Sequence, residues 1–345
     1  MNRRPAKAVA GFTMVELMVA MLLGLIVIAG VISVFLANQQ VYRTNAALGD
    51  VQNNTRMSFE MLAQNIREAG LLGCSNNGQV ANVLVDSPND GGTDWWANWG
   101  NALVGYGTGT TSANPALTVG TAAGNQVSGT DSLMILSAAD SGLSVNTQST
   151  AATTFTLNGT STDLAANKIM MVCDPWQATI FRASSYTAGT NPVVGYALGS
   201  TTNCSTGLGY PTVCTAVGNA YTYAANSPIA TLAAGVWYIG YNPLGTTSLY
   251  LASVNTATGT ATPPQETVRG VTAMHITYNM ANQTSFVAAS AVTSWSTVNA
   301  VQVSLTVQQT SATNAGTYTG SGTTAAAAPI KRTYTVTSAV RNRVQ

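Results

Sequence analysis

The sequence predicts an α+β protein in which one long N-terminal helix packs on an antiparallel β-sheet domain with long loops. Three features of the 345 residues lead to this prediction: an apolar segment near the N-terminus, an amphipathic stripe that continues it, and later segments rich in β-branched and aromatic residues. The first half of the helix is expected to be transmembrane and the second half amphipathic.

The apolar segment runs from Leu17 to Ala37, and Ser33 is its only hydroxyl residue. Its 21 residues are enough for a helix to cross a hydrocarbon core of about 30 Å. A leader with three basic residues and no acid precedes it. The segment exceeds the roughly 7–15 apolar residues of a secretory signal peptide, and no Ala-x-Ala cleavage site follows it. A membrane anchor therefore fits better than a signal peptide.

Glu16 interrupts the apolar pattern at the entry to this segment, where a carboxylate is costly unless it finds a partner. A simple anchor gives no reason for this residue. Cleavage after Gly11 would make Phe12 the new N-terminus, and its α-amino group would be a cation one helical turn from Glu16. We expect Glu16 to pair with that cation on its own chain or on a neighbouring chain.

The residues Gly11, Phe12, Thr13 and Glu16 resemble, position by position, the class III leader of type IV pilins and pseudopilins. The resemblance implies that prepilin peptidase cleaves after Gly11, that Phe12 is N-methylated and that Glu16 acts in assembly. It also implies a type IV pilin-like fold. Its expected parts are a leader at residues 1–11, a transmembrane half-helix at 12–37, an amphipathic half-helix at 38–73 and a β-rich domain at 74–345.

Residues at the end of the helix and at the C-terminus indicate which family of pilins the chain resembles. Arg67, Ala69, Gly70, Gly73 and Cys74, together with the segment 334–343, are similar to the PilW family of minor pilins, which is related to pseudopilin J of type II secretion. The resemblance implies a minor pilin that primes a type IV pilus and is incorporated at its tip. Two alternatives remain: a minor pseudopilin of a type II secretion system, and a pilus-tip adhesin.

The same resemblance implies the partners and the location. The expected partners are other minor pilins, the major pilin, prepilin peptidase, the inner membrane and the pilus assembly platform. The β-rich domain would lie in the periplasm before assembly and at the cell surface, on the pilus, afterwards.

The amphipathic half of the helix is expected to bury one stripe of side chains at intervals of three, four or seven, and to end at Gly70 and Gly73. The stripe consists of Val41, Leu48, Val51, Thr55, Phe59, Leu62, Ile66 and Ala69. Strands are expected at 131–137, 153–157, 169–173, 178–183, 236–241, 248–254, 271–280, 298–308 and 331–340. A Gly/Thr/Ala-rich linker, 316–328, separates the last two.

Four cysteines, Cys74, Cys173, Cys204 and Cys214, all follow the membrane segment. An even number in an exported domain favours disulfides, and four cysteines allow three pairings. We favour Cys204–Cys214, which closes a small loop, and Cys74–Cys173, which ties the end of the helix to the sheet. A zinc site is disfavoured because the spacing is wrong and His275 is the only histidine.

The composition argues against an enzyme and against nucleic-acid binding. Only 13 basic and 12 acidic residues occur, with a net charge of +1, so no basic surface is expected. No phosphate-binding loop, Ser/His/Asp set or metal-ligand spacing is present, and we expect no cofactor. His275 lies in a strand pattern and is interpreted as structural. Asp174 and Trp176 follow Cys173 at the end of an expected strand, and a turn before Pro175 explains them.

Two clusters could bind a ligand. Trp95, Trp96 and Trp99 form either an aromatic binding platform or, as we favour, a satellite core under a long loop. Asp86, Asp90 and Asp94 recur every four residues and are weak calcium candidates, because their spacing is not that of an EF-hand.

Overall fold

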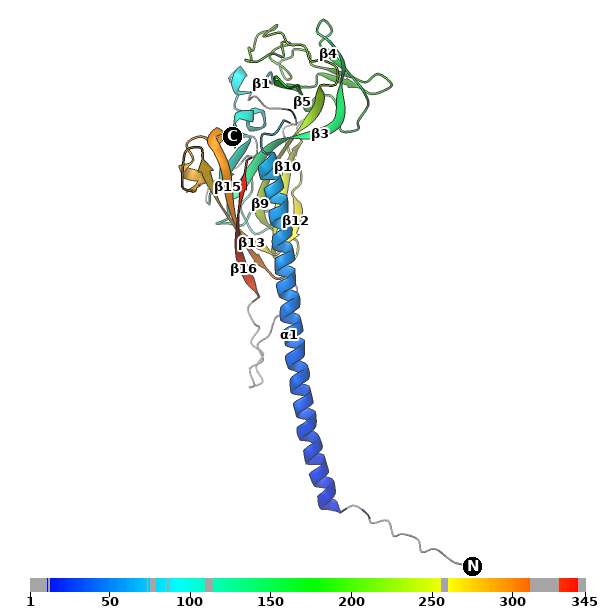
Figure 1. Cartoon of the computed structure of the whole chain (residues 1–345), viewed down its shortest axis with the longest axis vertical. Helices are drawn as coiled ribbons and strands as arrows, with labels where there is room; N and C mark the ends of the chain where they lie inside the picture. The colour runs from blue at the N-terminus through cyan, green and yellow to red at the C-terminus, as the bar shows by residue number, and fades with distance from the viewer. Residues whose placement is uncertain are drawn as a thin grey trace, which may run out of the picture. The chain divides into compact units, whose positions relative to one another are not determined.

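The structure, a computed structural model, describes residues 11, 13–72, 74, 79–85, 87–108, 114–255, 260–310 and 329–340. The chain forms two compact units. The first comprises Met1–Asp50 and Gln309–Ile330; the second, which we call the head, comprises Val51–Gln308 and Lys331–Gln345. Helix α1 (Met14–Glu68) begins in the first unit and ends in the head (Figure 1).

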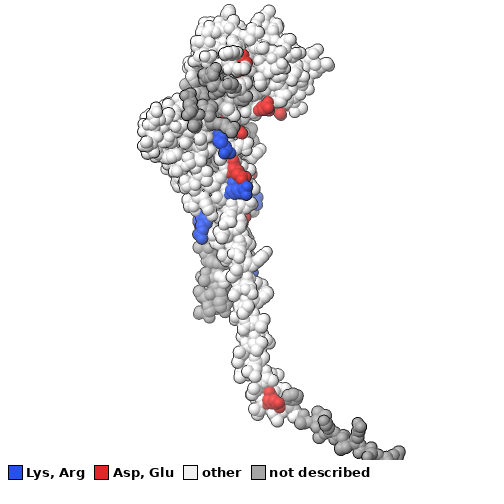
Figure 2. Space-filling model, in the orientation of Figure 1, with Lys and Arg blue, Asp and Glu red and all other residues white. Residues whose placement is uncertain are grey.

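In the first unit, α1 is a helix with an apolar surface. No residue between Met14 and Gln40 is buried, and the most apolar window of α1 is long and hydrophobic enough to cross a membrane. Figure 2 shows this part of α1 almost free of charge apart from an acidic patch at its start, which is Glu16. Farther along, the Asp50 carboxylate accepts both the N–H (2.9 Å) and the hydroxyl (2.7 Å) of Thr310.

In the head, one face of α1 is buried. Its buried positions recur every three or four residues, which is the helical period; they are Val51, Thr55, Ser58, Leu62, Ile66 and, just beyond the helix, Ala69. The expected stripe is confirmed over this stretch. Its first member is wrong, however: Val41 is 58 % exposed, because none of the described residues covers it.

Helix α1 ends just before Gly70, one of the two glycines at which the sequence predicts its end. Gly70 adopts a left-handed conformation (φ 69°), which a residue without Cβ adopts at little cost. Its N–H donates to the carbonyl of Leu136 at 2.8 Å, and the N–H of Ala138 donates to the carbonyl of Leu71 at 3.1 Å. The exit of the helix is therefore hydrogen-bonded to strand β3 of the head.

The head is rich in strands. They are β1 (Val80–Asn82), β2 (Leu103–Tyr106), β3 (Ser132–Ser149), β4 (Thr154–Leu157), β5 (Ile169–Cys173), β6 (Ala178–Arg182), β7 (Ser185–Thr187), β8 (Val193–Gly195), β9 (Pro228–Tyr241), β10 (Thr247–Asn255), β11 (Thr260–Ala261), β12 (Gln265–Arg269), β13 (Val271–Met280), β14 (Val287–Ala288), β15 (Val298–Gln308) and β16 (Lys331–Ala339). Short 3-10 helices lie at Pro88–Asp90, Trp95–Ala97, Trp99–Asn101, Ala289–Ala291 and Trp295–Thr297.

The strands form two sheets. The larger has 12 strands with a main order of β1-β6-β5-β9-β3-β4-β8-β7; β10 joins β9, β11 and β12 pair with β10, and β2 pairs with β3. The smaller has the order β14-β13-β15-β16. Every named pair is antiparallel except β1 with β6. The fold is thus the expected α+β arrangement of one long helix and an antiparallel head.

The buried face of α1 packs against both sheets in one hydrophobic core (Figure 1). Leu62 and Ile66 of α1 belong to the same cluster as Leu133 and Trp237 of the larger sheet and Val303 of the smaller one. At the last strand, the Ser338 hydroxyl donates to the carbonyl of Ala63 at 3.4 Å. In β15, burial alternates along the strand: Val301, Val303, Leu305 and Val307 are buried and the residues between them are half-buried.

Most expected strands are present, and three have the expected bounds, namely β5, β13 and β15. Two strands are much longer than expected: β3 extends to Ser149 and β9 begins at Pro228. The addition to β3 is rich in polar residues and that to β9 in alanine, and the two additions pair with each other in the larger sheet. The expected linker at 316–328 lies outside the described residues.

Candidate assembly helix and surface of the head

The start of α1 is organised by Thr13, the residue before the first helical turn. Thr13 Oγ1 accepts the backbone N–H of Glu16 at 3.3 Å, and the Thr13 carbonyl accepts the N–H of Leu17 at 3.2 Å. A threonine at this position with a glutamate three residues later is the pattern of a capping box. The sequence analysis missed this role of the Thr13–Glu16 pair, although the spacing itself could have indicated it.

The Glu16 side chain is exposed. Within the described part of the chain, no ion pair joins its carboxylate to a basic group. Phe12, whose amino group is the expected partner, lies outside the described residues, as do residues 1–10. A pairing between Glu16 and Phe12 therefore remains a prediction.

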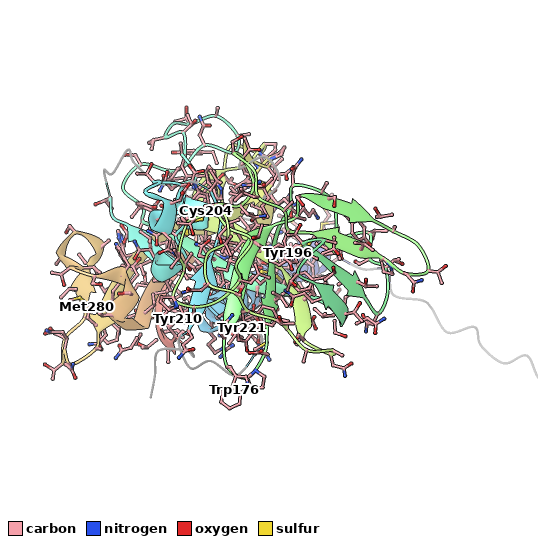
Figure 3. The ribbon with its side chains drawn as sticks, turned by 90° about the horizontal axis from the view of Figure 1, so that it is seen from above. Trp176, Tyr196, Cys204, Tyr210, Tyr221 and Met280 are labelled. Carbon is pink, nitrogen blue, oxygen red and sulfur yellow. A yellow bond between two sulfur atoms is a disulfide. The ribbon has the colours of Figure 1, made fainter. Side chains whose placement is uncertain are left out.

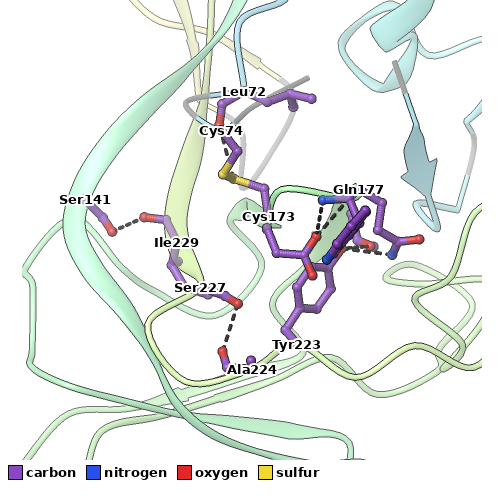
Figure 4. The surroundings of a disulfide bond; sticks show 12 residues. Leu72, Cys74, Ser141, Cys173, Gln177, Tyr223, Ala224, Ser227 and Ile229 are labelled. Carbon is purple, nitrogen blue, oxygen red and sulfur yellow. Dashed lines mark hydrogen bonds between the residues drawn. A yellow bond between two sulfur atoms is a disulfide. The ribbon is translucent and has the colours of Figure 1, made fainter. Parts of the chain in front are cut away.

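Two disulfides brace the head, and they are the two that the sequence analysis favoured. Cys74–Cys173 joins the segment after α1 to the end of β5, with 6.1 Å between the Cα atoms (Figure 4). Cys204–Cys214 closes a short loop, with 5.0 Å between the Cα atoms.

Comparison with protein-family models gives two matches. Residues 6–32 match the prokaryotic N-terminal methylation motif, and residues 236–342 match the type IV pilus-assembly protein W family, PilW. The two matches support a type IV pilus minor pilin of the PilW family. No curated protein and no solved structure gives a significant match.

The PilW match falls partly outside the residues that led to the resemblance. It covers the end of β9 and all later strands through β16, including most of the segment 334–343. Arg67–Cys74, at the exit of α1, lies outside both matched ranges. The matches fit a membrane-anchored pilin, a structural protein that interacts with other pilus components.

The tryptophan cluster of this PilW pilin is a satellite core, as favoured. Trp95, Trp96 and Trp99 are half-buried and pack against the buried cluster that contains Leu84 and Ile180. The rings of Trp95 and Trp96 meet edge to face, with 5.7 Å between centroids. Their faces are used for packing, so they offer little platform for a ligand.

A tryptophan outside this cluster is exposed to solvent. Trp176 is 69 % exposed at the turn between β5 and β6, and Figure 3 shows its ring projecting from the head. Asp174 does form the expected turn: its carboxylate accepts the N–H groups of Trp176 (2.9 Å) and Gln177 (3.0 Å) and the hydroxyl of Tyr221 (2.6 Å). The turn explains Asp174 but not the exposure of Trp176.

The loop closed by the Cys204–Cys214 disulfide is hydrogen-bonded to this turn through Gln177. Gln177 donates from Nε2 to the carbonyl of Leu208 (2.8 Å) and accepts from the N–H of Tyr210 at Oε1 (2.9 Å). The hydroxyl of Tyr223 is hydrogen-bonded to Gln177 and to Thr179 (Figure 4). Burial of Tyr223 raises the pKa of its phenol well above its ordinary range. Trp176 is therefore held on a rigid surface.

The calcium candidates are only partly described. Asp86 lies outside the described residues, and Asp90 lies within 4.8 Å of the sulfurs of Cys204 and Cys214. Those sulfurs are joined in a disulfide, so they are not thiolate ligands. Calcium needs about six to eight oxygen ligands, which this group does not supply. Calcium binding by Asp86, Asp90 and Asp94 remains an untested prediction.

His275 lies on β13 beside a carboxylate. Its Nδ1 is 3.9 Å from Oδ2 of Asp131, and its side chain is 61 % exposed. The sequence analysis did not connect these two residues, because they are far apart along the chain.

Proposed function

We propose that this PilW pilin primes assembly of a type IV pilus and is incorporated at the pilus tip together with other minor pilins. The observation that carries the proposal is the exposed apolar surface of α1: from Met14 to Gln40 no side chain is buried within the chain. Removing such a surface from water yields roughly 25 cal/mol per Å², first in the membrane and then against neighbouring helices.

In this proposal prepilin peptidase removes residues 1–11, and the amino group of Phe12 becomes the N-terminus. Residues 12–37 span the inner membrane, the helix continues from residue 38 to its end at Glu68, and residues 74–345 form the periplasmic domain. The Glu16 carboxylate then receives the Phe12 amine of a neighbouring pilin, which sets the register of docking. The partners are other minor pilins and the major pilin, delivered through the assembly platform.

The test is the position of the protein on pili. An epitope inserted between Gly189 and Thr190, in the exposed turn between β7 and β8, leaves α1 and the core untouched. Tagged protein should restore pilus number in a deletion strain, and gold label should lie at one end of each pilus. Label along the whole shaft would contradict a tip position, and normal piliation in the deletion strain would contradict priming.

A tip adhesin is the second candidate, and the specific observation that favours it is the exposed ring of Trp176. Aromatic side chains are enriched among residues that dominate binding surfaces. Pili carrying Trp176→Ala should adhere less well to the surfaces that wild-type pili bind, at equal pilus number. Trp96→Phe, which keeps a ring in the satellite core, serves as the matched control. Equal adherence of Trp176→Ala and wild-type pili would remove this candidate.

A further inference from the structure

The head contains a pocket of about 540 Å³ between β2 and β13, a size within the range of roughly 300–1,000 Å³ that is usual for small-molecule sites. One wall is the segment from Val104 to Thr108, and the opposite wall is His275–Thr277 of β13. The end of β14 and the segment after it line another side with Ala288, Ala289, Ser290 and Trp295, and Asp131 also lines the pocket. The walls come from both sheets, so only the folded head assembles this site.

Asp131 places a carboxylate in this pocket. The residue is only 8 % exposed, and its Oδ2 accepts the N–H of Ile276 at 2.7 Å. Burial raises the pKa of its carboxyl, against the opposing effects of the Ile276 N–H, of His275 and of the Thr108 N–H. The carboxylate is therefore less solvated than it would be in water, so a hydrogen-bond donor on a ligand would stabilise it.

Aromatic side chains line the same pocket. The ring of Trp295 meets Tyr278 edge to face, with 4.9 Å between centroids and an interplanar angle of 86°. Tyr278 is itself fully buried, so the indole packs against a ring that belongs to the core. Tyr106 of β2 also lines the pocket, while its ring packs against the cluster that contains Leu84 and Ile180. A fixed aromatic ring offers apolar area at a low cost in conformational entropy.

The charges and polar groups select one class of ligand. Among the described residues no lysine or arginine lines the pocket, and Asp131 repels anions, so an acidic ligand is disfavoured. The same carboxylate already accepts the N–H of Ile276 and lies 3.9 Å from Nδ1 of His275, so it does not require a cation. Hydroxyl groups of Thr108, Thr277 and Ser290 supply further donors and acceptors. A neutral ring with hydroxyl groups on its edge and an apolar face satisfies all of these groups.

We propose that this pocket binds a neutral saccharide, whose ring packs on Trp295 and whose hydroxyls donate to Asp131 and contact His275. The site is separate from α1, and the proposal is independent of the role of α1 in pilus assembly.

Because His275 is the only histidine, its imidazole is a unique reporter of this pocket. The experiment uses the full chain, made without a histidine tag, in a detergent that has no sugar headgroup. Imidazole proton–nitrogen NMR spectra are recorded during titration with a panel of neutral mono- and disaccharides, with a uronic acid and a diamine as charged probes. At least one neutral saccharide should shift the His275 signals saturably, with a Kd of about 1 mM or tighter.

Variants locate the binding. Trp295→Ala should weaken saccharide binding at least about tenfold, whereas Trp176→Ala, which removes an exposed tryptophan elsewhere, should leave it unchanged. If Trp295→Ala fails to fold, His275→Ala and Ser290→Ala, measured by saturation transfer to the saccharide, replace it, because neither side chain is in the core. The proposal is wrong if no neutral saccharide shifts His275, if only a charged probe does, or if the pocket variants bind as well as the wild type.

Discussion

The carboxylate of Asp131 accepts the backbone N–H of Ile276 at 2.7 Å, while the N–H of Asp131 donates to the carbonyl of Met274 at 2.9 Å. Asp131, which lies just before β3, thus makes two hydrogen bonds with β13, as a residue of a neighbouring strand would. The contact joins the two sheets of the head, because β3 belongs to the larger sheet and β13 to the smaller one. The link between the sheets is therefore polar as well as hydrophobic.

The first prediction follows from this link. Asp131→Ala leaves the buried N–H of Ile276 without its acceptor and should lower the free energy of unfolding by about 1–3 kcal/mol. Asp131→Asn keeps an acceptor and should cost less. Denaturant unfolding of the head, followed by near-ultraviolet circular dichroism, measures both changes. An Asp131→Ala protein as stable as the wild type would show that the bond contributes nothing.

The pH dependence of this stability has a definite sign. Burial raises the folded-state pKa of Asp131 above its unfolded value of about 3.9, so the protonated carboxyl is favoured by folding. This contribution is present below the unfolded pKa and is lost as the pH rises through the folded pKa. The stability of the wild type relative to Asp131→Asn should therefore fall as the pH rises from about 4. Asp163→Asn, at an exposed aspartate, is the control.

The second prediction concerns the buried hydroxyl of Tyr278. Its oxygen has no hydrogen-bond partner among the described residues, and a Cβ built on Gly105 would lie 1.8 Å from it. Tyr278→Phe should therefore be neutral or stabilise the head by up to about 1 kcal/mol. Gly105→Ala should destabilise it by about 1–3 kcal/mol through overpacking. Thermal unfolding of both variants tests the packing; a harmless Gly105→Ala would contradict it.

The third prediction ranks the two disulfides. Cys74–Cys173 spans 99 residues and Cys204–Cys214 spans 10, so the chain-entropy model assigns about 4–5 kcal/mol to the first and about 3 kcal/mol or less to the second. Cys74→Ser should thus lower the steady-state level more than Cys204→Ser does. Alkylation of unfolded, unreduced protein should find no free thiol. Four free thiols in periplasmic protein would rule out both bonds.

The fourth prediction concerns processing. Gly11→Val should leave an uncut precursor that stays in the membrane and does not enter pili, because the bulkier side chain sits at the cleavage site. Gly24→Val is the matched control: it places the same side chain inside α1, where nothing lies within 4 Å of the new Cβ, and should be processed normally. Mass spectrometry of the N-terminus distinguishes the two. A mature Phe12 terminus in Gly11→Val would refute the assignment.

The fifth prediction separates the two roles available to Glu16. Glu16→Ala and Glu16→Gln both remove the charge and should reduce pilus number and recovery of partner pilins, although processing continues. Thr13→Ala removes the hydroxyl that accepts the Glu16 N–H, costing helix stability of about 0.5–2 kcal/mol, but keeps the charge. It should retain most piliation. If Thr13→Ala fails like Glu16→Ala, helix capping rather than charge pairing explains Glu16.

The sequence by itself determined the features that depend on local pattern. The extent of α1, its apolar first half, its end at Gly70 and strands such as β13 and β15 follow from periodicity and from residues that stop a helix. The N-terminal motif and the cysteines could also be recognised from the sequence, because their chemistry is specified by residue type and spacing.

Only the tertiary structure decided which side chains are covered and which distant residues meet. Trp95 and Trp176 look alike in sequence, yet the first packs against a core and the second projects into solvent. The outer part of β3 is too polar, and that of β9 too rich in alanine and glycine, to predict as strands; they form where the two strands pair with each other. Asp131 meets His275 because two sheets come together there. Burial and pairing depend on the opposite surface, which no local pattern contains.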